Sequence, residues 1–318
     1  MQYRPLGRTG VHVSPLCLGA MMFGPWGNED EADSVRIIHR ALDAGINFVD
    51  TADVYSGGVS EEIVGKAIEA RREDVFLATK FFMPLYQVHR PSPDTDVSET
   101  LGALSDLVHQ GKVRYIGSSS YSGSRIVEAQ SAARERHLER FVTEQPPYSI
   151  LVRGVEEDVL PTARRHGMGT LTYSPLAGGW LSGRYRKNAS GGPASAARPQ
   201  ARFDMDVPAN QRKLDAAEQL AVLAEKAGLT LIELAVAFVI NHPGVTSAII
   251  GPRTMEQLEA FLPAAAVTLP ADVLDAVDEI VGPRSHGQPG RQQLRRLRAA
   301  TGPAASLTSR VSASAATP

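Results

Sequence analysis

Short apolar runs alternate with helical patterns along most of this chain, and this alternation limits the possible folds more than any other feature. The apolar runs have the length of buried strands, and the helical patterns carry apolar residues on one face. Strands that alternate with helices favour a parallel sheet. The predicted strands are residues 16–19, 46–50, 75–80, 85–89, 113–118, 140–145, 168–174 and 245–250.

Eight strands in about 280 residues predict an α/β fold, a closed (β/α)8 TIM barrel, rather than an open doubly wound sheet. A Rossmann fold would carry a GxGxxG motif after a strand, and none of the predicted strands is followed by one. Residues 2–14 fit a hairpin that closes the bottom of the barrel. The barrel domain is predicted to cover residues 1–282.

One junction lacks its crossover. Lys80 ends the third predicted strand and Leu85 begins the fourth, with only the residues FFMP between them. A parallel crossover needs a dozen or more residues, so the helix between strands 3 and 4 is missing. Residues 85–89 could instead fold back antiparallel, which would put His89 about 17 Å from Lys80. Alternatively, the natural chain contains residues that this sequence omits.

The charge is distributed unevenly. Residues 283–318 form a basic tail with six arginines and no acidic residue, whereas the rest of the chain carries 27 basic and 35 acidic side chains. An acidic body is not typical of a nucleic-acid-binding domain. The tail is rich in Ala, Ser, Pro and Gly and is predicted to be disordered, with a weak contact to an anionic partner as the alternative.

Cysteine content and hydropathy point to the cytoplasm. The single cysteine, Cys17, allows no intramolecular disulfide and no zinc cluster. The first ten residues lack the apolar region of a secretory signal. The most apolar stretch, residues 231–240, is too short for a membrane span and contains Glu233. A reduced, cytoplasmic protein with no membrane partner is therefore expected.

Four polar residues are expected at the carboxyl ends of the predicted strands, where barrel enzymes keep their catalytic residues. They are Asp50, Tyr55, Lys80 and His89. Tyrosine is a poor proton donor at neutral pH, and a nearby lysine should lower its pKa. An aspartate would keep that lysine charged, and a neutral histidine could orient a carbonyl.

Each of these residues has a simpler structural explanation when it is considered alone. Asp50 could cap a turn, Tyr55 could be a loop aromatic, and Lys80 could be a solvated strand end. His89 could be a loop histidine whose hydrogen bonds are satisfied. The combination of all four is far more specific than any single member.

Longer motifs resemble the aldo-keto reductase superfamily, and most closely its bacterial branch, which also resembles potassium-channel β subunits. The resemblance covers roughly residues 2–282, and DxxxY followed by GxSEExxG is its most specific signature. It implies reduction of aldehydes or ketones with NADPH and no metal, and it puts Asp50, Tyr55, Lys80 and His89 on the family's catalytic tetrad. The matching segments include LGRTGVHVSPLCLGAMMFG, INFVDTADVYSGGVSEEIVGKAI, VFLATK, LYQVHRP, EQPPYS and YSPLAGGWLSGRY.

The same resemblance implies an NADP(H) site. Ser119 and Gln145 would bind the carboxamide, Tyr173 would stack on the nicotinamide, and Arg253 would bind the 2′-phosphate. Two departures bear on this site: Ser120 stands where the family usually has Asn, and Phe261 replaces another family Asn. The predicted cofactor residues are Gly19, Ala20, Met21, Ser119, Gln145, Tyr173, Ser174, Leu176, Gly178, Arg184, Gly251, Arg253, Thr254 and Gln257.

The leading hypothesis is therefore an NADPH-dependent reductase of a small carbonyl substrate, with Tyr55 as the proton donor. A second hypothesis is an NADPH-binding barrel without catalysis and with a regulatory role. A third is a reductase that is defective through deletion or incompletely recorded at the Lys80–His89 segment. Residues 182–210 are expected to be a long loop over the cofactor or disordered. The sequence leaves the oligomeric state open.

Overall fold

The computed structural model describes residues 1–81, 87–92, 94–186 and 203–283. The chain divides into two units, Met1–Arg284 and Ser285–Pro318, and the described residues all belong to the first. The predicted disorder of the basic tail therefore concerns residues outside the described ranges, apart from Pro283. Residues 187–202 of the predicted long loop also lie outside them.

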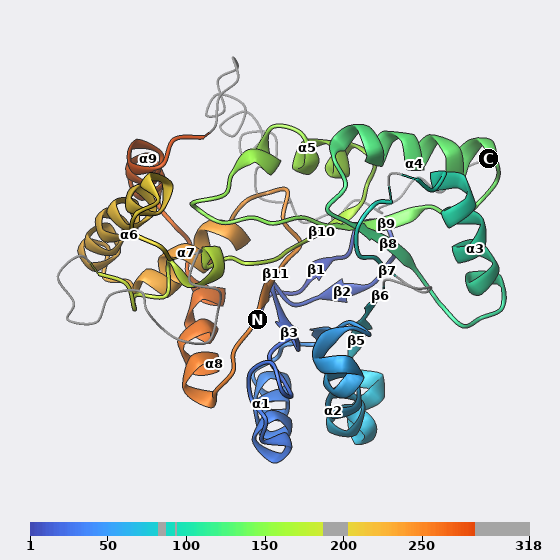
Figure 1. Cartoon of the computed structure of the whole chain (residues 1–318), viewed down its shortest axis with the longest axis horizontal. Helices are drawn as coiled ribbons and strands as arrows, with labels where there is room; N and C mark the ends of the chain where they lie inside the picture. The colour runs from blue at the N-terminus through green and yellow to red at the C-terminus, as the bar shows by residue number, and fades with distance from the viewer. Residues whose placement is uncertain (82–86, 93, 187–202, 284–318) are drawn as a thin grey trace, which may run out of the picture. The chain divides into compact units, whose positions relative to one another are not determined.

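The described strands form a nearly closed eight-stranded parallel barrel, which confirms the predicted fold (Figure 1). The sheet order is β5-β4-β3-β11-β10-β9-β8-β7-β6, and all neighbours are parallel. Only Thr79 separates β5 from β6, so these two are halves of one strand that brings the sheet edges together. The strands are β3 (Leu16–Gly19), β4 (Phe48–Asp50), β5 (Phe76–Ala78), β6 (Lys80–Phe81), β7 (Gln87–Val88), β8 (Ile116–Ser119), β9 (Phe141–Gln145), β10 (Gly169–Thr172) and β11 (Ser247–Ile250).

An N-terminal hairpin closes the bottom of the barrel, as the sequence suggests. Its strands, β1 (Arg4–Pro5) and β2 (His12–Val13), pair antiparallel. Leu6 and Val13 are buried in one apolar cluster with the inward-facing residues Cys17, Phe48 and Leu171 of three barrel strands. The hairpin thus excludes water from the amino-terminal end of the barrel, which leaves the carboxyl end for a site.

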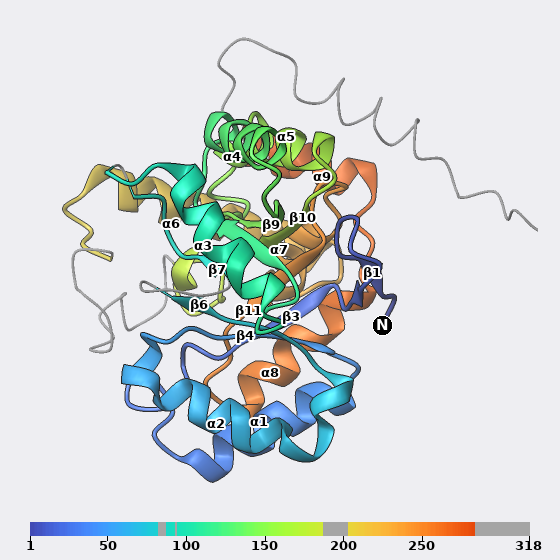
Figure 2. The same cartoon turned by 90° about the vertical axis from the view of Figure 1, so that its right-hand side faces the viewer.

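Helices with well-formed amino termini surround the strands, and α1, α2 and α8 lie side by side in Figure 2. Asp30, Asp96, Ser122, Thr230 and Thr254 each accept a backbone N–H bond at the start of a helix. Thr254, one of the predicted cofactor residues, is among these caps. The helices are α1 (Glu31–Asp43), α2 (Val59–Ile68), α3 (Val97–His109), α4 (Gly123–Glu135), α5 (Val159–Arg165), α6 (Pro208–Lys226), α7 (Leu231–Ile240), α8 (Met255–Phe261) and α9 (Ala271–Ile280).

The β6–β7 connection has no room for a crossover helix, since only residues 82–86 separate the two strands. The strands are nevertheless parallel, with Lys80 opposite Gln87 and Phe81 opposite Val88. The antiparallel alternative, with its 17 Å separation, is therefore wrong. Parallel pairing is possible because β6 and β7 pair over only two residues each. Between the end of β6 and the start of β7 the chain has to return by only about 3 Å along the strand direction. The predicted strand start at Leu85 lies outside the described residues.

β5, which precedes the short connection, is less buried than several other barrel strands. All three residues of β5 are half-buried, whereas every residue of β3, β4, β8 and β10 is buried. Between α2 and α3, the described residues contain only the short 3-10 helix η2 (Glu69–Asp74), which precedes β5, and no described helix lies between β6 and β7. The described residues as a whole include no helix long and apolar enough to cross a membrane.

Candidate active site

A buried ion pair forms the centre of the site. Asp50 ends β4 and Lys80 begins β6, and Lys80 Nζ donates to Asp50 Oδ2 at 2.5 Å. The same ammonium donates to the carbonyl oxygen of Thr51 at 2.7 Å. The exposed fraction is 2% for Asp50 and 1% for Lys80. Burial of both charges is tolerated because each one has a partner of opposite charge and a further hydrogen bond.

Tyr55 and His89 lie next to this pair. Tyr55 is the first residue of the short 3-10 helix η1 (Tyr55–Gly58). Lys80 Nζ lies 5.0 Å from the centre of its ring. The His89 ring meets the Tyr55 ring edge-on, with 6.4 Å between the ring centres. The structure therefore brings together all four residues that the sequence proposed as catalytic. His89 reaches the site because β7 runs parallel to β6.

The surroundings shift the pKa values of three of these groups. Burial raises the pKa of the Tyr55 phenol, and the Lys80 charge opposes this shift without cancelling it. The expectation of a lowered tyrosine pKa is thus wrong in its net direction. Burial alone would lower the pKa of Lys80, but Asp50 and Tyr55 together more than compensate and leave it raised. Burial, followed by the charges of Lys80 and Arg90, lowers the pKa of His89.

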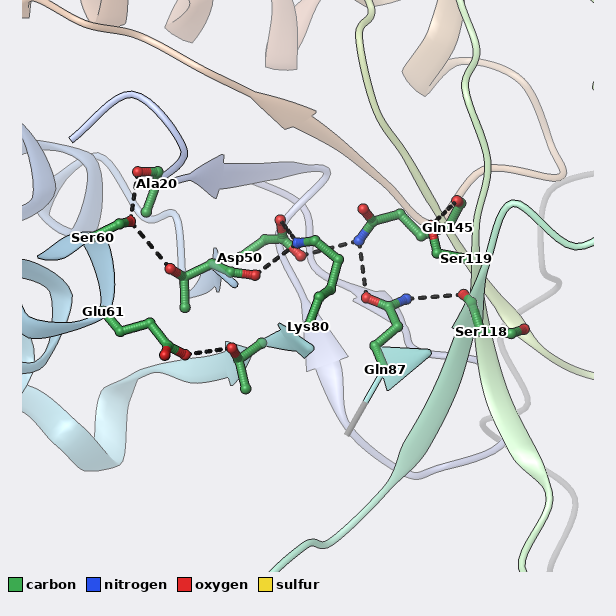
Figure 3. A network of polar contacts seen from close by, with 11 residues as sticks. Ala20, Asp50, Ser60, Glu61, Lys80, Gln87, Ser118, Ser119 and Gln145 are labelled. Carbon is green, nitrogen blue, oxygen red and sulfur yellow. Dashed lines mark hydrogen bonds and ion pairs between the residues drawn. The ribbon is translucent and has the colours of Figure 1, made fainter. Parts of the chain in front are cut away.

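Two glutamines extend the ion pair into a network across the barrel (Figure 3). Gln145, at the end of β9, donates from Nε2 to Asp50 Oδ1 at 3.0 Å and to Gln87 Oε1 at 3.1 Å. Gln87 donates in turn to the carbonyl oxygen of Ser118 at 3.1 Å. Sequence reasoning missed Gln87. Its position two residues before His89 was the available signal, because residues i and i+2 of a strand face the same side.

The carboxamide candidates Ser119 and Gln145 already donate within the protein. The Ser119 hydroxyl donates to the carbonyl oxygen of Gln145 at 2.9 Å. Since the Gln145 amide group donates to two neighbours, its Oε1 is held as an acceptor, and the Ser119 oxygen also keeps acceptor capacity. Two oriented acceptors fit the NH₂ of a carboxamide. Ser120 next to them has a φ of 62°, a left-handed conformation that Asn tolerates better than Ser.

Three predicted cofactor residues lie at or just after the end of β3, the strand beside β4: Gly19, Ala20 and Met21. A Cβ at Gly19 would lie 2.6 Å from Ile249 Cγ2, so this glycine permits the close approach of β3 to β11. Ala20 is buried, and its N–H donates to the carbonyl oxygen of Asp50 at 2.8 Å. Met21 is exposed. These contacts join the loop after β3 to the Asp50 strand.

Five predicted cofactor residues follow β10 in the sequence: Tyr173, Ser174, Leu176, Gly178 and Arg184. Tyr173 is half-buried and close enough to Tyr55 to contribute to the raised pKa of the phenol. Ser174 is exposed with a φ of 59°, and Leu176 precedes the short 3-10 helix η4 (Ala177–Gly179), which contains Gly178. Arg184 is exposed and follows this turn. Tyr173 is thus the member of this group with a described link to the central residues.

Four predicted cofactor residues lie between the end of β11 and the first turn of α8: Gly251, Arg253, Thr254 and Gln257. Thr254 caps the helix, and the N–H of Arg253 donates to Gln257 Oε1 at 2.9 Å. The Arg253 carbonyl accepts from Asn28 Nδ2 at 2.9 Å, which ties this loop to the one after β3. Gly251 is exposed, with open space where a Cβ would be. Phe261, the departure from the family, is buried in the core between barrel and helices.

The described residues contain no group of three or more His, Cys, Asp or Glu side chains that could hold a metal ion. The polar groups instead gather at the carboxyl ends of parallel strands and consist of a phenol, an ammonium, a carboxylate and an imidazole. Together they define a (β/α)8 barrel protein with a site suited to proton transfer.

A family model described as the aldo/keto reductase family matches residues 15–85 and 82–282. The chain belongs to this family. "Uncharacterized oxidoreductase YrpG" of Bacillus subtilis is 36% identical, over 88% of this chain and 96% of the relative. "Aldo-keto reductase YhdN" of the same species is 31% identical, over 92% and 100%. A "Probable voltage-gated potassium channel subunit beta" of Arabidopsis thaliana is 31% identical, over 88% and 97%. These matches support an oxidoreductase of a family that generally uses nicotinamide cofactors.

The two matched pieces meet at residues 82–85, in the short β6–β7 connection. The alignment with YrpG runs over 323 positions, whereas 88% of this 318-residue chain is only about 280 residues. Family members therefore contain residues that have no counterpart here. This agrees with the crossover that the sequence lacks.

Proposed function

We propose that this protein reduces an aldehyde or a ketone with NADPH and that Tyr55 donates the proton to the carbonyl oxygen. The observation that carries the proposal is the position of Lys80, which is bonded to Asp50 at 2.5 Å and lies 5.0 Å from the Tyr55 ring. An ammonium beside a phenol stabilises the phenolate that remains after proton donation.

Each of the four central residues has a role that fits its environment. The Tyr55 phenol holds its proton at neutral pH, and the Lys80 charge opposes the rise in pKa that burial causes, which favours donation of that proton. Lys80 stays charged because Asp50 raises its pKa. The lowered pKa of His89 keeps the imidazole neutral, so that it can orient the carbonyl through a hydrogen bond.

The cofactor residues suit a phosphorylated nicotinamide dinucleotide. Ser119 and Gln145 offer acceptors to the carboxamide, and Tyr173 offers an aromatic face. Arg253 has no carboxylate within ion-pair distance among the described residues, and a guanidinium matches a phosphate well. This favours NADPH over NADH. The bound cofactor supplies the hydride that the carbonyl carbon accepts.

Apolar side chains near Tyr55 favour a carbonyl substrate with an apolar or aromatic group. The Trp26 ring centre lies 6.2 Å from that of Tyr55, and Trp26 remains 54% exposed. Met21 and Val54 are exposed on the same two loops. Exposed large apolar residues that gather beside polar reactive groups are typical of a substrate pocket.

The decisive experiment follows NADPH oxidation in the presence of an aromatic aldehyde. We expect turnover in the natural protein and at least about 100-fold slower turnover in Tyr55→Phe. Trp26→Ala should raise KM for the aromatic aldehyde and leave KM for a small aliphatic aldehyde nearly unchanged. Equal turnover in the natural protein and in Tyr55→Phe would disprove the role of Tyr55.

A regulatory barrel that binds NADPH without turnover is the second candidate. The similarity to a relative named as a potassium channel β subunit favours it. This function predicts NADPH binding, no oxidation with any tested carbonyl, and recovery of a partner protein from cell extract. Turnover that depends on Tyr55 would exclude it as the sole function.

A chain made defective by the short β6–β7 connection is the third candidate, which the two-piece family match favours. Insertion of a relative's crossover segment between Pro84 and Leu85 should then create or restore turnover. If the unaltered chain already turns over at the rate of the insertion variant, the defect does not exist.

We also propose a cytoplasmic location, no nucleic-acid or membrane partner, and a small carbonyl compound as substrate.

A further inference from the structure

Glu144 is a buried carboxylate next to the site, and it has no assigned role. It immediately precedes Gln145 on β9 and has an exposed fraction of 0%. Since successive strand residues point to opposite faces, Glu144 points away from the barrel interior where Gln145 lies. It therefore cannot touch a substrate inside the barrel.

The Glu144 carboxylate instead holds the turn that follows β8. Its Oε2 accepts from the Ser118 hydroxyl at 2.5 Å, and its Oε1 accepts from the backbone N–H of Tyr121 at 3.0 Å. The backbone N–H of Ser120 also interacts with it. One carboxylate thus accepts hydrogen bonds from two donors of residues 118–121, a short segment that begins in β8 and ends before α4.

This turn carries Ser119, one of the two acceptors proposed for the nicotinamide carboxamide. The Ser119 hydroxyl and the Ser120 N–H both donate to the carbonyl oxygen of Gln145, at 2.9 and 3.2 Å. Ser120 has the unfavourable φ of 62°, which persists only where surrounding contacts impose it. Glu144 bonds Ser118 and Tyr121, on either side of Ser120, so the geometry of the acceptor pair depends on it.

The charge of Glu144 is poorly compensated. No Lys, Arg or His of the described residues forms an ion pair with it. Titratable groups around the same turn are the Tyr121 phenol, on which Glu144, Arg125 and Glu128 act, and Asp158, which accepts from the N–H of Gly123. Burial raises the pKa of Tyr121 to about 12, so it stays neutral.

We propose that ionised Glu144 is the positioning residue for the turn 118–121, and that its protonation releases the turn and weakens binding of the nicotinamide cofactor. Ser118 and Tyr121 donate to different oxygens of the side chain, and a neutral carboxylic acid offers them fewer acceptor sites than a carboxylate does. Burial raises the pKa of Glu144 to about 7, so the switch operates near neutral pH. This proposal rests on the proposed cofactor site.

The first test measures NADPH affinity by fluorescence titration at pH 6 and pH 8. If the turn is competent only when Glu144 is ionised, NADPH binding should be about tenfold weaker at pH 6 than at pH 8, because the ionised fraction falls about tenfold between these pH values. Glu144→Gln should bind weakly at both pH values and lose this dependence. Glu128→Gln, an exposed glutamate on α4, should retain it.

The second test needs no cofactor. Hydrogen exchange of the natural protein, corrected for intrinsic rates, should show lower protection of the Tyr121 amide at pH 6 than at pH 8. The Gly123 amide, which donates to Asp158 at 2.7 Å, is the neighbouring reference. This measurement also serves if Glu144→Gln does not fold.

The outcomes separate the two proposals. If NADPH does not bind at any pH but Tyr121 protection changes, the cofactor proposal fails and the positioning role stands. If NADPH binds equally at both pH values and Tyr121 protection is constant, the positioning role is wrong, whatever the enzyme reduces.

Discussion

Lys80 Nζ lies 2.5 Å from Asp50 Oδ2, and both side chains are almost completely buried. Removal of one partner would leave the other charge without compensation. Lys80→Met should therefore lower the free energy of unfolding by about 3–5 kcal/mol. Urea denaturation measures this loss. The double variant Asp50→Asn with Lys80→Met should recover much of it, and an equally destabilised double variant would contradict the argument.

Tyr55→Phe removes the proposed proton donor and keeps the aromatic ring. We expect turnover to fall by about 10²- to 10⁴-fold, with NADPH affinity unchanged. Steady-state rates and a binding titration provide the two measurements. Tyr115→Phe is the matched control, because the Tyr115 hydroxyl donates to Thr9 in the N-terminal hairpin loop. Similar losses in both variants would show a general structural effect.

Ser120→Asn should stabilise the turn after β8. At a φ of 62°, Asn is favoured over Ser, and the free energy of unfolding should rise by up to about 1 kcal/mol. The added amide should also tighten NADPH binding. Ser122→Asn is the control, because Ser122 has a φ of −71° and caps α4, where Asn and Ser are equivalent. A lower melting temperature of Ser120→Asn than of the natural protein would contradict this prediction.

Arg153 holds together segments from distant parts of the chain. It donates to Glu156 and to Asp278, and its side chain is 3% exposed. Arg153→Met should cost about 3–5 kcal/mol of unfolding free energy, since it leaves two carboxylates without this partner. Arg36→Met, which removes an ion pair from a 64% exposed arginine, should change it by less than about 1 kcal/mol. Equal effects in guanidinium denaturation would refute the difference.

Glu144 should make stability depend on pH. Its pKa is raised from 4.5 to about 7, so between these values the folded state holds a proton that the unfolded state has lost. Its contribution is therefore complete below about pH 4.5 and is lost as the pH rises through 7, by up to about 3 kcal/mol. Glu144→Gln should gain stability relative to the natural protein from pH 5 to pH 8. Parallel pH profiles of the two proteins would exclude this linkage.

Local patterns were sufficient for most of the fold. Apolar runs marked the strands and one-sided apolar patterns marked the helices, because both depend on neighbours in the sequence. Eight strands that alternate with helices in about 280 residues indicated the barrel. The pairing at the short junction could not be predicted, because the strand segments there are two residues long and local periodicity has no meaning at that length.

The sequence by itself determined the family, the barrel and the positions that follow its strands, since these depend on order along the chain. Tertiary structure decided which of those positions meet. It brought His89 to Tyr55, inserted Gln87 into the Asp50 network, and set the net direction of the Tyr55 pKa. These properties depend on burial and on distances between side chains far apart in the sequence, because desolvation and charge act through space.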